Sequence, residues 1–143
     1  MKINIETIPH QQHRYNTVGD YWMTPDGTLQ IRISDLGGLD HELPILIHEL
    51  VEWYLCQKRG VRLEDIDSFD RVFELERSIG RHPEEEPGDS PEAPYAREHR
   101  FAENIERQVV HEAGLRWDDY EAHISKDWLT PDSVQGSIRK LTP

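Results

Sequence analysis

Three side chains that could bind a metal ion or move a proton lie within five positions of one apolar segment. In "LPILIHELVEWYLC", residues 43–56, these are His48, Glu49 and Glu52. On a helix, His48 and Glu52 stand at i and i+4, about 40° apart around the axis, so both can reach one ion. Glu49 lies on the flank of that face, where it could act as general base toward a metal-bound water molecule. The segment therefore predicts a metal site in a buried helix.

The same spacing recurs further along the chain. His99 and Glu103 are four residues apart in "PYAREHRFAENIERQVVHEA", residues 94–113, and Glu106 continues the stripe. If the two helices pack together, His48, Glu52, His99 and Glu103 can converge on one ion. Two imidazoles with carboxylates suit Zn²⁺ first, with Fe²⁺ and Mn²⁺ as alternatives. A divalent cation would also offset the several kcal/mol that burying an unpaired carboxylate costs.

Simpler interpretations of these residues stay open. Glu49 and Glu52 could pair with arginines such as Arg59, and His48 could be a hydrogen-bonded core histidine. The stripe that begins at His99 could be the solvated face of an amphipathic helix.

A further helix, expected over residues 63–79, carries Asp70 and Glu74 at the same spacing. We expect them to form a solvated edge or to pair with Arg71 and Arg77. Either could still supply a third metal ligand.

The elements that must position these residues indicate an α+β fold. Residues 2–8 alternate polar and apolar side chains, and "PDG" at 25–27 separates two β-prone runs, which predicts a hairpin over 20–34. Three helices are expected after it, over residues 44–58, 63–79 and 94–113. A small N-terminal antiparallel sheet followed by about three helices is an α+β arrangement.

The chain has 143 residues, which suits one domain. We expect a single α+β domain over residues 1–114. Residues 80–94, "GRHPEEEPGDSPEAP", form an inserted acidic loop that would border the site. The tail over residues 115–143 is expected to pack on the domain or to contact a partner.

Composition limits the classes of partner. The formal net charge of −12 argues against nucleic acid and against anionic membranes as direct ligands. The single cysteine, Cys56, excludes a disulfide framework and a cysteine-rich zinc site. Neither a signal-peptide pattern nor an apolar run long enough to span a bilayer is present, so we expect a cytoplasmic protein.

Three segments carry a resemblance. "IHELVEWYLC", "FD..FE" and "EPGD.P.APY..EH.FA..IE" resemble a family of small uncharacterised proteins of bacterial and phage genomes, for which no activity is established. More remotely, a strand, a His-Glu helix and a later ligand helix resemble the zincin metallopeptidases, which carry His-Glu-x-x-His.

The zincin resemblance implies a zincin-like fold and a metal-dependent hydrolase, with peptidase activity as one form of it. His48 then matches the first ligand and Glu49 the base, and His99 or Glu103 takes the place of the downstream ligand. Glu52 stands where the second histidine would be, so the site departs from the zincin pattern and is more anionic.

Two other functions use the same residues differently. The pairs Glu49/Glu52 and Glu103/Glu106 look like the Mg²⁺ sites of all-α nucleotide pyrophosphohydrolases. Alternatively, the chain is not an enzyme but an acidic interaction protein that mimics DNA for a basic partner.

Overall fold

The chain begins with a small mixed sheet. The computed structural model describes residues 1–82 and 85–126, and the strands in this part are β1 (Ile3–Ile8), β2 (Gly19–Met23) and β3 (Leu29–Ser34). They lie in the order β1-β3-β2, so β3 is the central strand. The predicted α+β class, a small sheet followed by helices, is confirmed.

The two edge strands pair with β3 in opposite senses. The predicted hairpin is present, with β2 antiparallel to β3 and Tyr21 opposite Ile31. β1 runs parallel to β3, with Ile5 opposite Ile31, because residues 9–18 carry the chain across to the far edge before β2 begins. The apolar side chains of β3 that alternate along one face, Leu29, Ile31 and Ile33, are all buried.

Four α-helices follow in the described part of the chain: α1 (Leu39–Arg59), α2 (Leu63–Ser78), α3 (Ala96–Glu112) and α4 (Trp117–Ile124). α1 begins five residues before the predicted start at Pro44. The first turn is held by the Glu42 carboxylate, which accepts hydrogen bonds from the backbone N–H groups of Leu36 (2.8 Å) and Gly38 (3.3 Å). α1 ends at Gly60, whose φ of 72° lies in the left-handed region that favours glycine.

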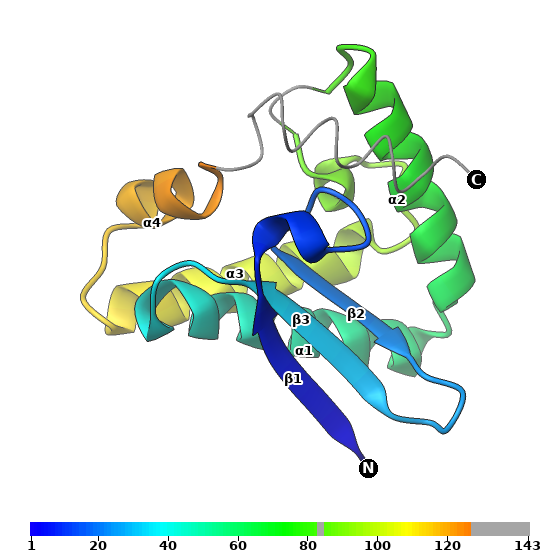
Figure 1. Ribbon diagram of the computed structural model, residues 1–143, viewed down its shortest axis with the longest axis horizontal. Helices are drawn as coiled ribbons and strands as arrows, with labels where there is room; N and C mark the ends of the chain where they lie inside the picture. The colour runs from blue at the N-terminus through cyan, green and yellow to red at the C-terminus, as the bar shows by residue number, and fades with distance from the viewer. Residues whose placement is uncertain (83–84, 127–143) are drawn as a thin grey trace.

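Helix α1 is the one that lies mainly against the sheet in the described part of the chain. α1 contacts β2 and β3, and α3 packs along α1. Figure 1 shows α2 and α4 toward opposite sides of the molecule, with α1 and α3 between them. The core lies among these elements and includes Ile31 of β3, Ile45 and Cys56 of α1, and Val110 of α3.

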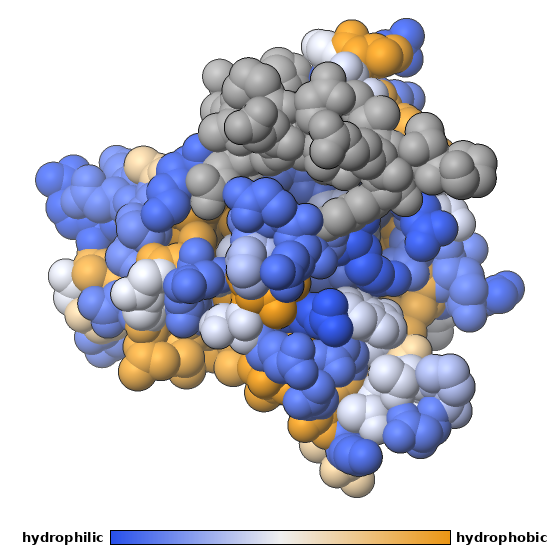
Figure 2. All heavy atoms as spheres, viewed as in Figure 1, coloured by the Kyte–Doolittle hydropathy of each residue, from blue (hydrophilic) through white to orange (hydrophobic). Residues whose placement is uncertain are grey.

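The beginning of the predicted tail packs on this core. Tyr120 and Ile124 of α4 are buried, and α4 contacts α3 and α1. The remainder of the tail, residues 127–143, lies outside the described residues. Among the residues coloured in Figure 2, many are hydrophilic, and hydrophobic ones gather along the lower left of the view. Among the described helices, none combines the length and the apolar character that crossing a membrane requires.

Candidate metal centre

The packing of α1 against α3 brings three side chains of the predicted site together. His48 Nε2 lies 3.1 Å from Glu52 Oε2 and 3.2 Å from His99 Nδ1, and the last two atoms are 2.9 Å apart. All three residues are buried. His48 and Glu52 come together because they are four residues apart on α1, and His99 reaches them from the buried stripe of α3.

These three atoms form a triangle of the size that a metal ion needs. Ligand atoms at about 2.0–2.1 Å from a tetrahedral zinc ion are separated from one another by about 3.3 Å. The observed separations of 2.9 to 3.2 Å are close to that value. One ion can therefore be reached by His48, Glu52 and His99 together.

The second ring nitrogen of His48 is held by a carboxylate. His48 Nδ1 lies 2.7 Å from Glu106 Oε1, and the other oxygen of Glu106 accepts a hydrogen bond of 2.6 Å from the Tyr120 hydroxyl. This contact requires a proton on Nδ1, which in a neutral imidazole leaves the Nε2 lone pair facing Glu52 and His99. A carboxylate behind a histidine is the usual support for a histidine that binds a metal.

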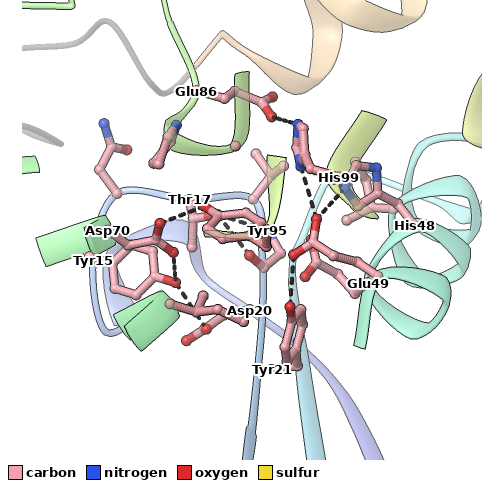
Figure 3. A pocket seen from close by; sticks show the side chains of 18 of the residues that line it. Tyr15, Thr17, Asp20, Tyr21, His48, Glu49, Asp70, Glu86, Tyr95 and His99 are labelled. Carbon is pink, nitrogen blue, oxygen red and sulfur yellow. Dashed lines mark hydrogen bonds and ion pairs between the residues drawn. The ribbon is translucent and has the colours of Figure 1, made fainter. Parts of the chain in front are cut away.

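Two carboxylates lie near the outer nitrogen of His99, at ion-pair distance and without a hydrogen bond of the kind that His48 makes with Glu106. His99 Nε2 lies 3.3 Å from Glu86 Oε2 and 3.4 Å from Asp89 Oδ1, in the loop before α3. Figure 3 shows Glu86 and His99 facing each other. Gly88 lies against the imidazole ring so closely that a Cβ there would overlap it. The loop therefore fixes the ring both by charge and by contact.

Glu52 is oriented by a strand of the sheet. The hydroxyl of Tyr21, in β2, donates a hydrogen bond of 2.8 Å to Glu52 Oε1, which leaves Oε2 for the two histidines. Tyr21 is itself buried. Each of the three grouped side chains thus has a partner on its outer side.

The acids and histidines of this group shift one another's pKa values. Burial alone would lower the pKa of His48, but its contacts with Glu106 and Glu52 outweigh burial and raise the pKa well above 6.5. The pKa of His99 is raised in the same way by Asp89, Glu52 and Glu86 against the effect of burial. Burial would raise the pKa of Glu52, but both histidines bind its carboxylate and lower the pKa to about 2. Without an ion, both imidazoles therefore bind a proton more readily than an ordinary histidine does.

Glu49, the predicted general base, lines the same cavity but stays outside the triangle. Its carboxylate lies against the backbone of β2, and a Cβ on Gly19 would stand 2.6 Å from Glu49 Oε1. Burial and the neighbouring charge of Glu52 raise the pKa of Glu49 well above its usual range. A carboxylate with a raised pKa beside a candidate metal position accepts a proton more readily than an ordinary glutamate does.

Glu103, also predicted as a ligand, lies outside the group that the structure brings together. Its half-buried carboxylate is 3.9 Å from Arg107 on the same helix. Glu106, one turn further along α3, is the glutamate of this helix that contacts His48. The reason is angular: Glu106 is about 20° from His99 around the helix axis, whereas Glu103 is about 40° away on the other side.

The prediction of a solvated edge at Asp70 and Glu74 is wrong, because both residues are buried. Glu74 pairs with Arg77 at 3.3 Å, as one of the predicted alternatives has it. Asp70 accepts hydrogen bonds from the hydroxyls of Tyr15 and Tyr95, and neither it nor Glu74 joins the triangle.

Two cavities meet at the group. The smaller, of about 70 Å³, extends toward α2 and the loop before β2, and the larger, of about 340 Å³, extends between α3 and α4. Both are lined by His48, Glu86, Glu106 and Ile124. The candidate metal position therefore lies where a ligand could enter from either side.

Comparisons of the chain with models of protein families, with curated proteins and with solved structures find no match.

Four residues that support the site were not predicted individually: Tyr21, Glu86, Asp89 and Tyr120. The acidic loop was expected to border the site, but its sequence does not indicate which of its carboxylates faces His99.

Proposed function

We propose that the chain is a divalent-metal-dependent hydrolase whose ion is held by His48, Glu52 and His99. The observation that carries the proposal is the triangle of ligand atoms at 2.9 to 3.2 Å from one another. The outer contacts add support, since each histidine has a carboxylate on its other nitrogen and Glu52 has a phenol on its other oxygen. Such a supported set is what a preorganised metal site requires.

Zinc is the ion that we favour. Two histidines and one glutamate, with the remaining coordination position open, form a common catalytic zinc site, and the same ligands also suit Fe²⁺ and Mn²⁺. A divalent ion at this position would polarise a substrate carbonyl and make water more acidic.

The residues of the chain would then have two roles, proton transfer and metal binding. Glu49 lies beside the triangle in the same cavity and would take a proton from the attacking water and pass it to the leaving group. His48, Glu52 and His99 would keep their positions through the reaction, because their partners on α3, β2 and the acidic loop hold them. An amide or ester bond is the substrate bond that this arrangement fits, and a peptide bond is the one that we favour.

The two other functions find less support. In a pyrophosphohydrolase, Glu49, Glu52, Glu103 and Glu106 would surround Mg²⁺, but Glu103 faces Arg107 and Glu106 faces His48. A DNA mimic needs its acids on an exposed face. Here several carboxylates are buried and converge on one cavity instead; they belong to Asp20, Glu52, Asp70 and Glu106.

Elemental analysis of untagged protein tests the proposal. We expect about one equivalent of zinc, iron or manganese in the wild type, and its loss in His48→Ala and Glu52→Ala. Glu103→Gln is the matched control and should keep the metal, because Glu103 lies outside the triangle. Wild-type protein that stays metal-free after reconstitution would return these residues to the role of a hydrogen-bonded core cluster.

A further inference from the structure

A buried carboxylate in the smaller cavity has no cationic partner in the described part of the chain. Asp70, on α2, is 4% exposed, and its two oxygens accept hydrogen bonds from the hydroxyls of Tyr15 (3.0 Å) and Tyr95. Both tyrosines are also buried. Phenol donors are neutral, so they orient the carboxylate but do not balance its charge.

The arginines near Asp70 are bound to other acids. Arg14 contacts Asp20 at 2.7 Å and Asp67 at 3.1 Å. Arg77 contacts Glu74 at 3.3 Å. A buried carboxylate without a counter-ion is costly, and a positively charged ligand would remove that cost.

Asp70 lies close enough to the candidate metal centre for one ligand to contact both. Asp70, Tyr15 and Tyr95 line the same small cavity as His48 and Glu52. The Tyr95 side chain bridges the two places, because its hydroxyl binds Asp70 while its ring meets the His99 ring edge-on, with 6.1 Å between the centroids. Figure 3 shows Tyr95 between Asp70 and His99.

The sizes of the two cavities indicate which part of a ligand each could hold. About 70 Å³ admits a small charged head group, whereas about 340 Å³ on the other side of His48 admits a longer chain. A ligand that places a head group at Asp70 would therefore have the bond at the metal centre close to that end, because both places line the smaller cavity.

We propose that Asp70, Tyr15 and Tyr95 form a binding site for a primary ammonium group of the substrate, so that the substrate is a peptide or amide with a free amino group close to the bond that is cleaved. The carboxylate supplies the counter-charge, and the two tyrosine hydroxyls hold it in place. The position of the cleaved bond rests on the proposed hydrolase function, but the binding of an amine does not.

The test uses n-propylamine and 1-propanol, which are similar in size and differ in charge at neutral pH. Each is titrated calorimetrically into the wild type, Asp70→Asn and Asp65→Asn, and the metal content of every sample is measured. Asp65→Asn is the matched control, because Asp65 is an exposed acid on the same helix.

We expect the wild type and Asp65→Asn to bind propylamine at least tenfold more tightly than propanol, and Asp70→Asn to lose this preference. Equal affinity of the wild type for the two probes would overturn the proposal even if Asp70→Asn did not fold. A preference that survives in Asp70→Asn would also overturn it and would place the amine elsewhere, for example on the ion. Amine binding by protein that holds no metal even after reconstitution would support the amine site and contradict the proposed hydrolase function. A bound metal without a preference for the amine would contradict the amine site and leave the proposed hydrolase function supported.

Discussion

Nδ1 of His48 lies 2.7 Å from Oε1 of Glu106, across the interface between α1 and α3. This contact fixes which nitrogen of His48 faces Glu52 and His99, because the proton must stay on the side of Glu106. Glu106 would therefore support the proposed site although it lies outside the triangle.

Replacing Glu106 should weaken metal binding without removing the ligands. We expect Glu106→Gln to lower zinc affinity by about 10- to 100-fold, measured by competition with a chromophoric chelator. Glu103→Gln, on the same helix, should leave the affinity within about twofold of the wild type. Equal losses in the two variants would indicate a general effect of charge rather than the orientation of His48.

Glu49→Gln should separate metal binding from catalysis. Because Glu49 lies outside the triangle, the variant should keep its metal and lose about 10²- to 10⁴-fold of any hydrolytic rate. Asp40→Asn, an exposed acid on the same helix, should keep both. A Glu49→Gln protein that purifies without metal would show that Glu49 is a ligand instead.

The stability of metal-free protein should fall as pH rises above about 6.5. The pKa values of His48 and His99 are raised in the folded state by their carboxylate partners. Such groups stabilise the fold fully below their unfolded pKa, and this stabilisation is lost as pH rises through the folded pKa. Thermal unfolding in a chelator, between about pH 6 and pH 9, measures the effect.

Metal affinity should change with pH in the opposite direction. Zinc competes with the protons on His48 and His99, so binding should release protons and strengthen as pH rises through the same range. Calorimetry in buffers of different ionisation enthalpy counts the protons released. Binding without proton release would contradict protonated imidazoles in the metal-free protein.

Asp70→Asn should stabilise the metal-free fold more at high pH than at low pH. Burial raises the pKa of Asp70 from 3.8 to about 8, so the stability associated with this group is lost as pH rises between those values. The advantage of the variant should therefore widen by up to about 1.4 kcal/mol per pH unit in that range. Chemical denaturation at about pH 5 and pH 8 measures it, and a constant difference would exclude a buried, ionising Asp70.

Gly88→Ala should damage the site through contact alone. A Cβ at Gly88 would overlap the His99 ring, so the loop or the ring must move, at a cost of about 1–3 kcal/mol. We expect weaker metal binding together with a lower melting temperature. Glu92→Ala, an exposed position in the same loop, should change neither.

The sequence was informative about the fold wherever a periodic pattern was strong. The hairpin, the helices α1, α2 and α3 and the i, i+4 pair His48/Glu52 follow from patterns within one segment, whereas α4 was not predicted. The parallel pairing of β1 does not, because it depends on which edge of β3 the chain reaches after residues 9–18. The early start of α1 depends on Glu42 folding back onto Leu36, a local contact that the apolar periodicity of the helix does not indicate.

Some residues around the site could likewise be predicted from a local pattern, and others could not. His99 was predicted because it repeats the spacing of His48, and Glu106 could have been preferred to Glu103, because His99, Ala102, Glu106 and Val110 form one buried stripe on α3. Asp70 was misjudged because it lies on a polar helix, and only the tertiary packing of Tyr15 and Tyr95 encloses it. Such contacts leave no local pattern.

An ion shared by Glu52 and His99 would also act as a cross-link. These residues are 47 positions apart, and the chain between them contains all of α2 and the acidic loop. Holding together the ends of a loop of that length costs conformational entropy, and the free energy of metal binding would offset this cost in the folded chain. With one buried cysteine, the chain has no disulfide of its own. The metal would thus tie the two ends of this loop together, so that any unfolding that separates Glu52 from His99 would release it.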